Sequence, residues 1–280
     1  MADDQFTPDR PKLYHYKLDR ILGQGGTGRV YRGIDTKKGE VVAIKLFKEN
    51  FFRNVLHLRD IVKSVKRFKK YSHPNVVKIY DFMDGEDGKC MIMEYVDGPD
   101  LKWYLINRPW NVKERIGVIS QICSGLQYLH EQKIIHHDIK PANILFTRTG
   151  MVKLADFSLY GNSLLLDLID KGAGEQITPM YVPPEIIRGE GASPQSDQYS
   201  LGVTMYLLFA ERLPFQVDNL QRLYQCHLSV QPDHPSLVNP KCPHALGDVI
   251  LKLMAKKPAD RFGDCDELRI AIAEMGRSRI

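Results

Sequence analysis

An acidic side chain, a lysine and an amide stand close together in one short segment, His136-His137-Asp138-Ile139-Lys140-Pro141-Ala142-Asn143. A second acidic residue, Asp156, opens the triplet Asp156-Phe157-Ser158 thirteen residues after Asn143. Asp138 could accept or orient the proton of an attacking hydroxyl, while Asn143 and Asp156 offer oxygen ligands that suit Mg²⁺. Each acid alone is typical of an ordinary loop carboxylate. Their combination predicts a catalytic site.

A glycine-rich stretch lies upstream of these residues, at Gly23-Gln24-Gly25-Gly26-Thr27-Gly28-Arg29-Val30. Its small residues would let backbone N–H groups approach phosphate oxygens closely, although a plain glycine hairpin can show the same pattern. The context is strand-turn-strand, which argues against the strand-turn-helix of a dinucleotide site. Fifteen residues after Val30, Lys45 ends the apolar run Val42-Ala43-Ile44-Lys45. A lone lysine in a strand usually extends its ammonium to solvent. Because the glycine-rich stretch and the segment with Asp138 and Asn143 are also present, Lys45 is expected to hold ATP phosphates.

The elements that would position these residues change character near Tyr95. Before it, short β-branched and aromatic runs between glycine turns predict five mostly antiparallel strands, at residues 16–22, 29–34, 41–47, 76–82 and 90–95. Apolar residues at helical spacing, ending at Phe68, predict one helix between the third and fourth strands. After Tyr95 the pattern predicts helices at about 113–131, 196–209 and 245–254, with short apolar strands at 144–146 and 152–154. A cleft between two such lobes, joined by residues 96–99, is a usual place for a small-molecule site.

Composition narrows the class of protein. The 280 residues are 43% hydrophobic and 26% charged, which is near average globular usage, and the net charge of +5 is too mild to indicate nucleic-acid binding. The five cysteines are scattered and form no C-x-x-C pair, as expected for reduced thiols in the cytoplasm. No secretory leader or membrane-spanning run is present in the printed sequence, so no membrane segment is expected.

Together these motifs resemble those of the eukaryotic-like protein kinases, and of bacterial serine/threonine kinases in particular, over about residues 14–275. The resemblance implies an α+β fold of two lobes: a small lobe (14–95) of five antiparallel strands plus one helix, and a larger, mainly helical lobe (96–276). Residues 1–13 and 277–280 would be tails. Three downstream segments carry the same resemblance, namely Thr178-Pro179-Met180-Tyr181-Val182-Pro183-Pro184-Glu185, Ser196-Asp197-Gln198-Tyr199-Ser200-Leu201-Gly202 and Lys257-Pro258-Ala259-Asp260-Arg261-Phe262.

Those segments imply particular structural roles. The first resembles the end of an activation segment. In the second, Asp197 would steady the catalytic loop from a buried helix, and in the third Arg261 would form a buried pair with Glu185. The hydrophobic spine between the lobes would consist of four residues, Phe68, Ile79, His136 and Phe157.

The resemblance also implies the cofactors and the site. Asp138, Lys140 and Thr178 would serve catalysis, with Lys140 on the γ-phosphate and Thr178 bonded near it, a pattern that favours serine or threonine hydroxyls as acceptors. Asn143 and Asp156 would hold Mg²⁺, for which Mn²⁺ could substitute. The residues implied to bind ATP are Leu22, Gly23, Gln24, Gly25, Gly26, Thr27, Gly28, Val30, Ala43, Lys45, Met93, Glu94, Val96, Asp100, Asn143, Leu145 and Asp156.

Within that set, Met93 would guard the back of the adenine pocket, and the backbone from Glu94 to Val96 would bond to adenine. Asp100 could reach the ribose. The base would lie between the apolar side chains of Val30, Ala43 and Leu145. The partner would be a protein substrate; no nucleic acid is expected.

Several residues depart from the family pattern. Nine residues before His73, where these kinases place the glutamate partner of Lys45, stands Ser64; Asp60, one turn earlier, could substitute. His137 replaces the arginine that binds a phosphorylated activation loop, and a neutral ring is expected there. Ser158 replaces a glycine, and the apolar run at 164–169 could form a short helix that holds an inactive state or a docked loop.

Three alternatives stay open. A pseudokinase that binds nucleotide or serves as a scaffold would explain Ser64, and a small-molecule kinase would share the fold. The basic helix over residues 53–70 is either a solvated face or a docking site for an acidic partner or a second lobe, which would give a homodimer through the small lobe. Five residues suggest zinc, but their spacing matches no closed tetrahedral pattern, so zinc is not expected: Cys226, His227, His234, Cys242 and His244.

Overall fold

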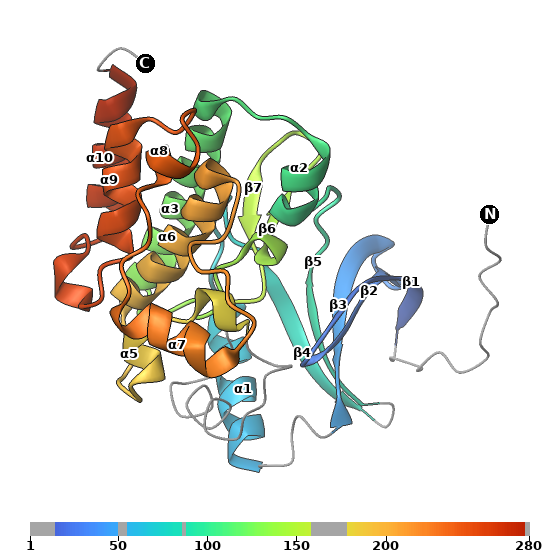
Figure 1. Ribbon diagram of the computed structural model, residues 1–280. Helices are drawn as coiled ribbons and strands as arrows, with labels where there is room; N and C mark the ends of the chain where they lie inside the picture. Colours follow the sequence, from blue (N-terminus) through green and yellow to red (C-terminus); the bar gives the residue numbers. More distant parts are fainter. Residues whose placement is uncertain (1–14, 50–54, 86–87, 158–177, 278–280) are drawn as a thin grey trace. The chain divides into compact units, whose positions relative to one another are not determined.

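The structure is a computed structural model that describes residues 15–49, 55–85, 88–157 and 178–277. By their contacts the described residues form two compact units. The N-terminal unit holds those up to Ser72 together with Lys78–Val96. The C-terminal unit holds His73–Val77 and the residues from Asp97 onward. Figure 1 shows strands and one helix in the first unit, and mainly helices in the second.

The N-terminal unit is built on a five-stranded antiparallel sheet in the order β1-β2-β3-β5-β4 (Figure 1). The strands are β1 (Tyr16–Gly25), β2 (Gly28–Asp35), β3 (Glu40–Phe47), β4 (Ile79–Gly85) and β5 (Gly88–Glu94). The helix α1 (Val55–Phe68) follows β3 and packs against β4. This is the five-stranded sheet with one helix that the sequence predicts.

The turn between β2 and β3 explains why these strands pair in this register. The carboxylate of Asp35 accepts hydrogen bonds from the backbone N–H groups of Lys37 and Lys38, at 2.9 and 3.2 Å, and Gly39 has the left-handed φ of +72°. Both features favour a tight turn. Central β3 is rich in β-branched residues and is buried at Val42, Ala43 and Ile44, which fixes its place in the sheet.

The prediction for the fourth strand was wrong at its start. The strand was expected from Val76, but β4 begins at Ile79. Val76 instead forms a bridge with Leu154, and the N–H of Val77 donates to the carbonyl of Leu154 at 2.9 Å. Both valines are buried within the C-terminal unit. They are apolar because they pack there, and not because they continue the sheet.

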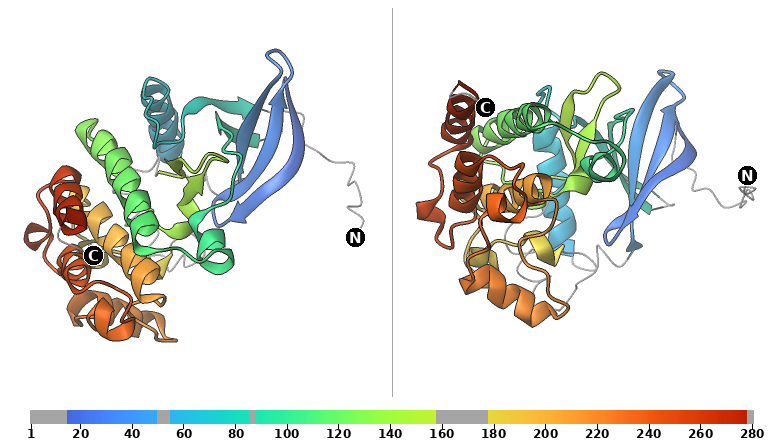
Figure 2. Two further views of the ribbon diagram at one scale, coloured as in Figure 1. Left: turned by 90° about the horizontal axis from the view of Figure 1, so that it is seen from above. Right: turned by 45° about the horizontal axis from the view of Figure 1, so that its top comes forward.

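The C-terminal unit consists mainly of helices and one short hairpin (Figures 1 and 2). The helices are α2 (Leu101–Asn107), α3 (Val112–Glu131), α5 (Pro184–Ile187), α6 (Pro194–Ala210), α7 (Leu220–Ser229), α8 (Pro235–Val238), α9 (His244–Leu253) and α10 (Cys265–Arg277), with 3-10 turns η2 (Pro141–Asn143), η3 (Pro179–Tyr181) and η4 (Pro258–Asp260). The hairpin pairs β6 (Ile144–Phe146) with β7 (Val152–Leu154).

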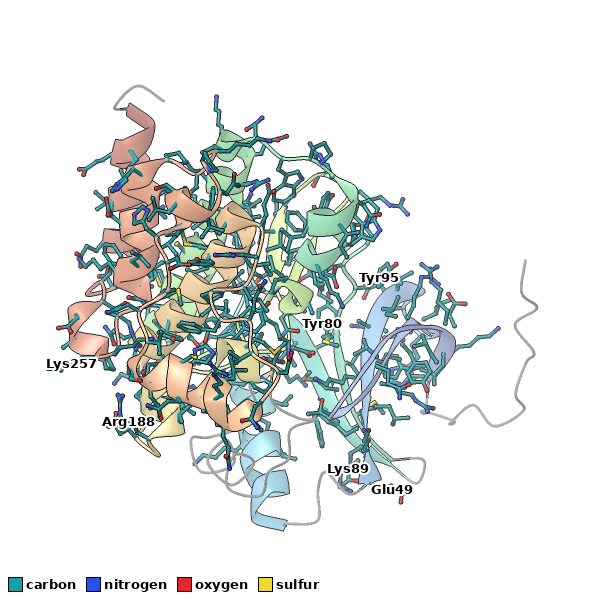
Figure 3. The ribbon with its side chains drawn as sticks, in the orientation of Figure 1. Glu49, Tyr80, Lys89, Tyr95, Arg188 and Lys257 are labelled. Atoms are coloured by element: carbon teal, nitrogen blue, oxygen red, sulfur yellow. The ribbon has the colours of Figure 1, made fainter. Side chains whose placement is uncertain are left out.

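The core of this unit surrounds α6, which is buried along almost its entire length. α3 packs against both α6 and α10, and α9 packs against α6 (Figure 2). Side chains fill the space among these helices, as Figure 3 shows. A helix that is apolar all round is expected where other helices cover every face.

Capping residues set the start of the two central helices. Asn111 accepts from the N–H of Glu114 at 2.9 Å, and Glu114 accepts from the N–H of Asn111 at 3.0 Å, so α3 begins with a capping box. Pro194 stands at the first position of α6, where a missing N–H costs nothing.

Candidate active site

The catalytic loop predicted from the sequence forms one connected group of side chains around Asp138. The ammonium of Lys140 lies 2.8 Å from Oδ2 of Asp138 and donates to Oγ1 of Thr178 at 2.7 Å. The amide nitrogen of Asn143 donates to the backbone carbonyl of Asp138 at 2.8 Å and to its Oδ2 at 2.7 Å. Lys140 and Asn143 therefore hold the Asp138 carboxylate in one orientation. Thr178 contacts Lys140, as expected.

Asn143 and Asp156 lie at the same end of the β6–β7 hairpin. Ile144 pairs with Leu154, and the N–H of Ala155 donates to the carbonyl of Asn143 at 2.8 Å, so Asn143 stands opposite the residue next to Asp156. Asp156 has the left-handed φ of +55°, which departs from the regular strand. Because both amide hydrogens of Asn143 bond to Asp138, its oxygen Oδ1 is directed away from that residue.

A residue that the sequence reading missed holds β7 in place. The side chain of Asn75 donates to the carbonyl of Val152 at 2.9 Å and to Gln121 at 3.2 Å. The oxygen of Gln121 in turn accepts from the N–H of Val152 at 2.9 Å. The strand that leads to Asp156 is thus fixed to α3. Asn75 stands beside His73 and Pro74 in the sequence, but nothing in its type indicates this role.

The backbone of the loop is anchored by Asp197 on α6, as the resemblance implied. Its carboxylate accepts from the N–H groups of His136 and His137, both at 2.8 Å. Nε2 of His130, at the end of α3, lies 2.8 Å from the same carboxylate. Burial alone would raise the pKa of Asp197, but the hydrogen bond from His130 opposes this, and the pKa lies below its ordinary value. Asp197 is therefore an anionic anchor.

Sequence reasoning did not identify His130. Its role requires the end of α3 to meet the start of α6, and the two residues are 67 positions apart. The only indication in the sequence was that His130 lies six residues before His136. A histidine in the last turn of a helix is common, so its position did not point to Asp197.

The loop histidines are held uncharged by burial. His136 is fully buried, and burial lowers its pKa; its ring meets that of Phe157 edge to face at 6.1 Å. Burial likewise lowers the pKa of His137, which agrees with the neutral ring expected near neutral pH. His137 has a φ of +67°, an uncommon conformation for a residue with a side chain. Its backbone bond to Asp197 stabilises this conformation.

The buried pair implied further along the chain is confirmed. Arg261 forms a two-pronged contact with Glu185, at 2.7 Å and 2.8 Å, and both side chains are essentially inaccessible to solvent. The hydroxyl of Ser196 donates to Glu185 at 2.7 Å, and Arg261 also donates to the carbonyls of Ala255 and Gln195. The pair connects α5 to the segment after η4.

The glycine-rich loop occupies the hairpin of β1 and β2 in the N-terminal unit. Gly25 pairs with Gly28, and Gly26 and Thr27 form the tip. A Cβ on Gly28 would lie 2.1 Å from the carbonyl oxygen of Leu46, so this glycine is required for contact with β3. A Cβ on Gly23 or Gly25 would meet no atom within 4 Å. Packing within the chain therefore explains Gly28 but not the other two.

The register of the sheet brings several predicted nucleotide-binding residues together. Lys45 pairs with Val30 on one side and Met91 on the other, and Ala43 pairs with Met93. Lys45 is only 8% exposed, and its ammonium lies 5.8 Å from the ring centroid of Phe47. Leu22 lies on β1, and Glu94 ends β5, where its carboxylate accepts from the N–H of Lys78 at 3.1 Å. The N-terminal unit ends two residues later, at Val96.

Asp100 has a structural task in the C-terminal unit. Its Oδ1 accepts from the N–H of Trp103 at 2.7 Å, so Asp100 caps α2. Asp100 also forms a backbone bridge with half-buried Leu145 on β6, which places two predicted nucleotide-binding residues side by side. Capping of α2 is sufficient to explain an aspartate at this position. The contact of Asp100 with the ribose of ATP stays a prediction.

Two departures from the family pattern fall outside the described residues, namely Ser158 and the apolar run at 164–169. Ser64 is described and is half-buried on α1. The side chain of Asp60 lies outside the described side chains, so its substitution for the missing glutamate stays a prediction.

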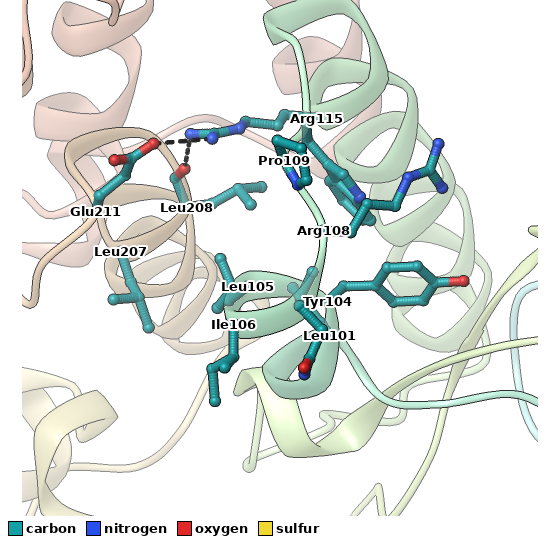
Figure 4. Close-up of a pocket in the computed structure, with 12 residues that line it drawn as sticks. Leu101, Tyr104, Leu105, Ile106, Arg108, Pro109, Arg115, Leu207, Leu208 and Glu211 are labelled. Carbon is teal, nitrogen blue, oxygen red and sulfur yellow. Dashed lines mark hydrogen bonds and ion pairs between the residues drawn. The ribbon is translucent and has the colours of Figure 1, made fainter.

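A cavity of about 380 Å³ lies elsewhere in the C-terminal unit, between α2, the start of α3 and the end of α6. Figure 4 shows the guanidinium of Arg115 at its edge, bonded to the carbonyl of Leu208 and to Glu211. The residues that line it include none of the predicted site residues. The cavity is therefore separate from the catalytic loop.

Comparison with known proteins decides the family. The model of the protein kinase domain matches residues 16–270. The chain belongs to the protein kinase domain family. Among curated proteins this kinase domain is 33% identical to the probable serine/threonine-protein kinase PknB of Lactococcus lactis and 31% identical to the serine/threonine-protein kinase PrkC of Bacillus subtilis, in each case over 92% of the chain.

The chain spans only 41% and 40% of the length of these two relatives. Among solved structures, the kinase domain of Mycobacterium tuberculosis PknI matches with a TM-score of 0.75 and 25% identity, over 94% of this chain and 97% of that one. The protein-kinase fold predicted from the sequence is confirmed. No described helix is long and apolar enough to cross a membrane.

Proposed function

We propose that this kinase domain transfers the γ-phosphate of Mg-ATP to serine or threonine hydroxyls of a protein substrate. The observation that carries the proposal is the arrangement at Asp138, whose carboxylate is fixed by Lys140 and Asn143 while Lys140 also reaches Thr178. The bacterial relatives named as serine/threonine-protein kinases support the same acceptor class. A cytoplasmic location remains part of the proposal.

In this reaction Asp138 would orient the acceptor hydroxyl and take up its proton as the oxygen attacks. Lys140, 2.8 Å from Asp138, places a positive charge where negative charge develops on the transferred group. Thr178 keeps that ammonium in position by accepting its hydrogen bond. Catalysis of this kind rests on positioning and on neutralisation of charge.

The donor set at the end of the β6–β7 hairpin fits Mg²⁺. Asp156 offers a carboxylate, and the free side of the Asn143 amide offers Oδ1, both of which are oxygen ligands. Mg²⁺ bound to these residues would neutralise the phosphate oxygens. Because Asn143 also bonds to Asp138, the residue that holds the cation and the residue that orients the hydroxyl are mechanically connected.

The N-terminal unit would supply the remaining nucleotide contacts. The open space at Gly23 and Gly25 on β1 leaves room for phosphate oxygens to approach the backbone. Lys45, largely buried on β3, lies on the other side of β2. Ala43 and Met93, paired across β3 and β5, would contact the adenine.

The acceptor class can be tested with the purified chain, γ-labelled ATP, Mg²⁺ and a generic protein substrate, followed by acid hydrolysis to phosphoamino acids. We expect label on phosphoserine and phosphothreonine, because Lys140 and Thr178 follow the serine/threonine pattern. Predominant phosphotyrosine would contradict the acceptor class. Absence of label above that of an Asp138→Asn variant would contradict phosphotransfer itself.

A pseudokinase is the second candidate, and Ser64 is the observation that favours it. Half-buried on α1, Ser64 stands where related kinases carry the acidic partner of Lys45, and its short side chain bears no charge. If the missing carboxylate limits activity, Ser64→Glu should raise the rate of transfer severalfold, whereas the matched Ser64→Gln should not. An unchanged rate in Ser64→Glu would show that a glutamate at this position is dispensable here.

A further inference from the structure

Two imidazole rings and a carboxylate meet in the C-terminal unit, where α8 and α9 begin. His234 caps the start of α8, His244 is the first residue of α9, and Asp248 lies one turn later on the same helix. Nε2 of His234 lies 3.4 Å from Oδ1 of Asp248, and Nδ1 of His244 lies 3.3 Å from Oδ2. The three ligand atoms all lie within 4.8 Å of one another.

These distances are long for hydrogen bonds and are compatible with a coordination shell. Zn²⁺ binds nitrogen and oxygen ligands at about 2.0–2.2 Å, so two ligands at neighbouring corners of a tetrahedron lie about 3.3–3.6 Å apart. Each imidazole nitrogen lies at that spacing from one carboxylate oxygen, His234 from Oδ1 and His244 from Oδ2, so one ion would be shared by both oxygens of Asp248. As hydrogen bonds they are long, since N–H to O contacts usually measure about 2.9–3.0 Å.

His234 is built into the fold as a fixed ligand. Its side chain is only 14% exposed, and its ring packs on Gly247, where an added Cβ would lie 2.2 Å from Cε1. Nδ1 lies 2.8 Å from the hydroxyl of Ser236. Nδ1 also accepts from the backbone N–H of Ser236 at 3.3 Å, which is the cap of α8. Metal binding at Nε2 would move the ring proton to Nδ1, which would then donate to the Ser236 hydroxyl in place of accepting from the backbone.

The other two ligands are accessible to an incoming ion. His244 is 76% exposed and Asp248 is 63% exposed. The two rings stack with centroids 4.3 Å apart and planes inclined by 24°. Nδ1 of His244 already faces Asp248, and the exposed ring can turn to meet an ion bound between His234 and Asp248. Buried His234 would thus hold the ion rigidly, while exposed His244 and Asp248 leave a path by which the ion can enter.

The remaining residues of the group considered in the sequence take no part. Nδ1 of His227 lies 2.8 Å from the hydroxyl of Tyr199, and Cys242 lies 3.6 Å from the carbonyl of Pro243. The ligand that completes the set, Asp248, was not among them, because only the fold brings it beside His234.

We propose that His234, His244 and Asp248 bind a divalent first-row transition ion, Zn²⁺ foremost, with water at the remaining position. Two imidazoles favour Zn²⁺, Ni²⁺ or Cu²⁺ over Mg²⁺ or Ca²⁺, which prefer oxygen ligands alone. The bound ion would tie the start of α8 to the first turn of α9. This site lies on other residues than the proposed phosphotransfer site and does not depend on that activity.

Calorimetric titration of the chain with Zn²⁺, in excess Mg²⁺, tests the proposal. The parent should bind one more equivalent than His244→Ala, and Asp248→Asn should bind that equivalent at least about tenfold more weakly, as expected for loss of a ligand. Asp233→Asn is the matched control, because this neighbouring carboxylate pairs with Arg212 outside the group. It should titrate like the parent.

A thermal melt of the same proteins gives a second readout. Zn²⁺ should raise the melting temperature of the parent and of Asp233→Asn by the same amount, and that of His244→Ala by clearly less, because only binding to the folded state stabilises it. His244 is exposed, so its replacement should leave the far-ultraviolet circular dichroism unchanged. Equal stoichiometry and affinity in the parent and His244→Ala would overturn the proposal.

Discussion

At the scale of single residues, the proposed chemistry depends on how the Asp138 carboxylate is held. Asp138, Lys140 and Asn143 lie within six residues of one another, so the sequence alone predicts their proximity, and the structure adds the contacts. Thr178 is 38 residues from Lys140, and only the family resemblance pointed to it. His130 was missed, because a partner 67 residues away cannot be inferred from residue type.

Replacement of Thr178 tests whether the position of Lys140 matters. Thr178→Val keeps the shape of the side chain but removes the oxygen that accepts from the ammonium at 2.7 Å. A hydrogen bond to a charged group contributes about 1.5–3 kcal/mol, so kcat for transfer should fall roughly 10-fold or more. Thr178→Ser keeps the oxygen and should retain most of the activity. Steady-state kinetics would contradict this role if Val and Ser variants were equally active.

At the scale of elements, α6 organises the C-terminal unit. Its first turn carries Asp197 toward the catalytic loop. The same turn meets the Glu185–Arg261 pair through Gln195 and Ser196. The sequence pattern predicted this helix, and the family resemblance implied that it is buried, as the structure confirms. Helices α2, α7 and α10 were not predicted. α2 has only seven residues, too few for a helical period to be clear, whereas α7 and α10 are amphipathic helices whose pattern the prediction missed.

The Glu185–Arg261 pair gives a prediction about stability. Glu185→Gln leaves the Arg261 guanidinium buried without its counter-charge, which should lower the free energy of unfolding by about 3–5 kcal/mol. Glu190→Gln is the control, because Glu190 pairs with Arg188 on the surface and its loss should produce no comparable change. Urea denaturation near neutral pH measures both. Equal stability of the two variants would contradict a structural role for the buried pair.

The same pair predicts how stability depends on pH. Burial alone would raise the pKa of Glu185, but the hydrogen bonds and charge of Arg261 outweigh it and hold the folded-state pKa below the ordinary value. The resulting stabilisation is therefore complete above the ordinary glutamate pKa and is lost as the pH falls through the lowered folded-state pKa. Repeating the denaturation at about pH 4 should narrow the difference between the parent and Glu185→Gln.

At the scale of the whole molecule, the sequence predicted both units of the protein-kinase fold, because period-two and helical patterns are separated along the chain. It misplaced the start of β4, because Val76 and Val77 are apolar for a different reason, their burial against Leu154. It did not predict that Asp100 caps α2, while the implied ribose contact of Asp100 stays a prediction. Local residue types cannot distinguish such tasks.

The central claim is that the Asp138 carboxylate serves phosphotransfer and not nucleotide binding. The most direct measurement compares the parent with Asp138→Asn for kcat of phosphate transfer and for ATP affinity in the same preparations. The substitution keeps the shape of the side chain but removes its charge and basicity. We predict a fall in kcat of roughly 10²–10⁴-fold with unchanged ATP affinity. Equal kcat values in the two proteins would contradict the account.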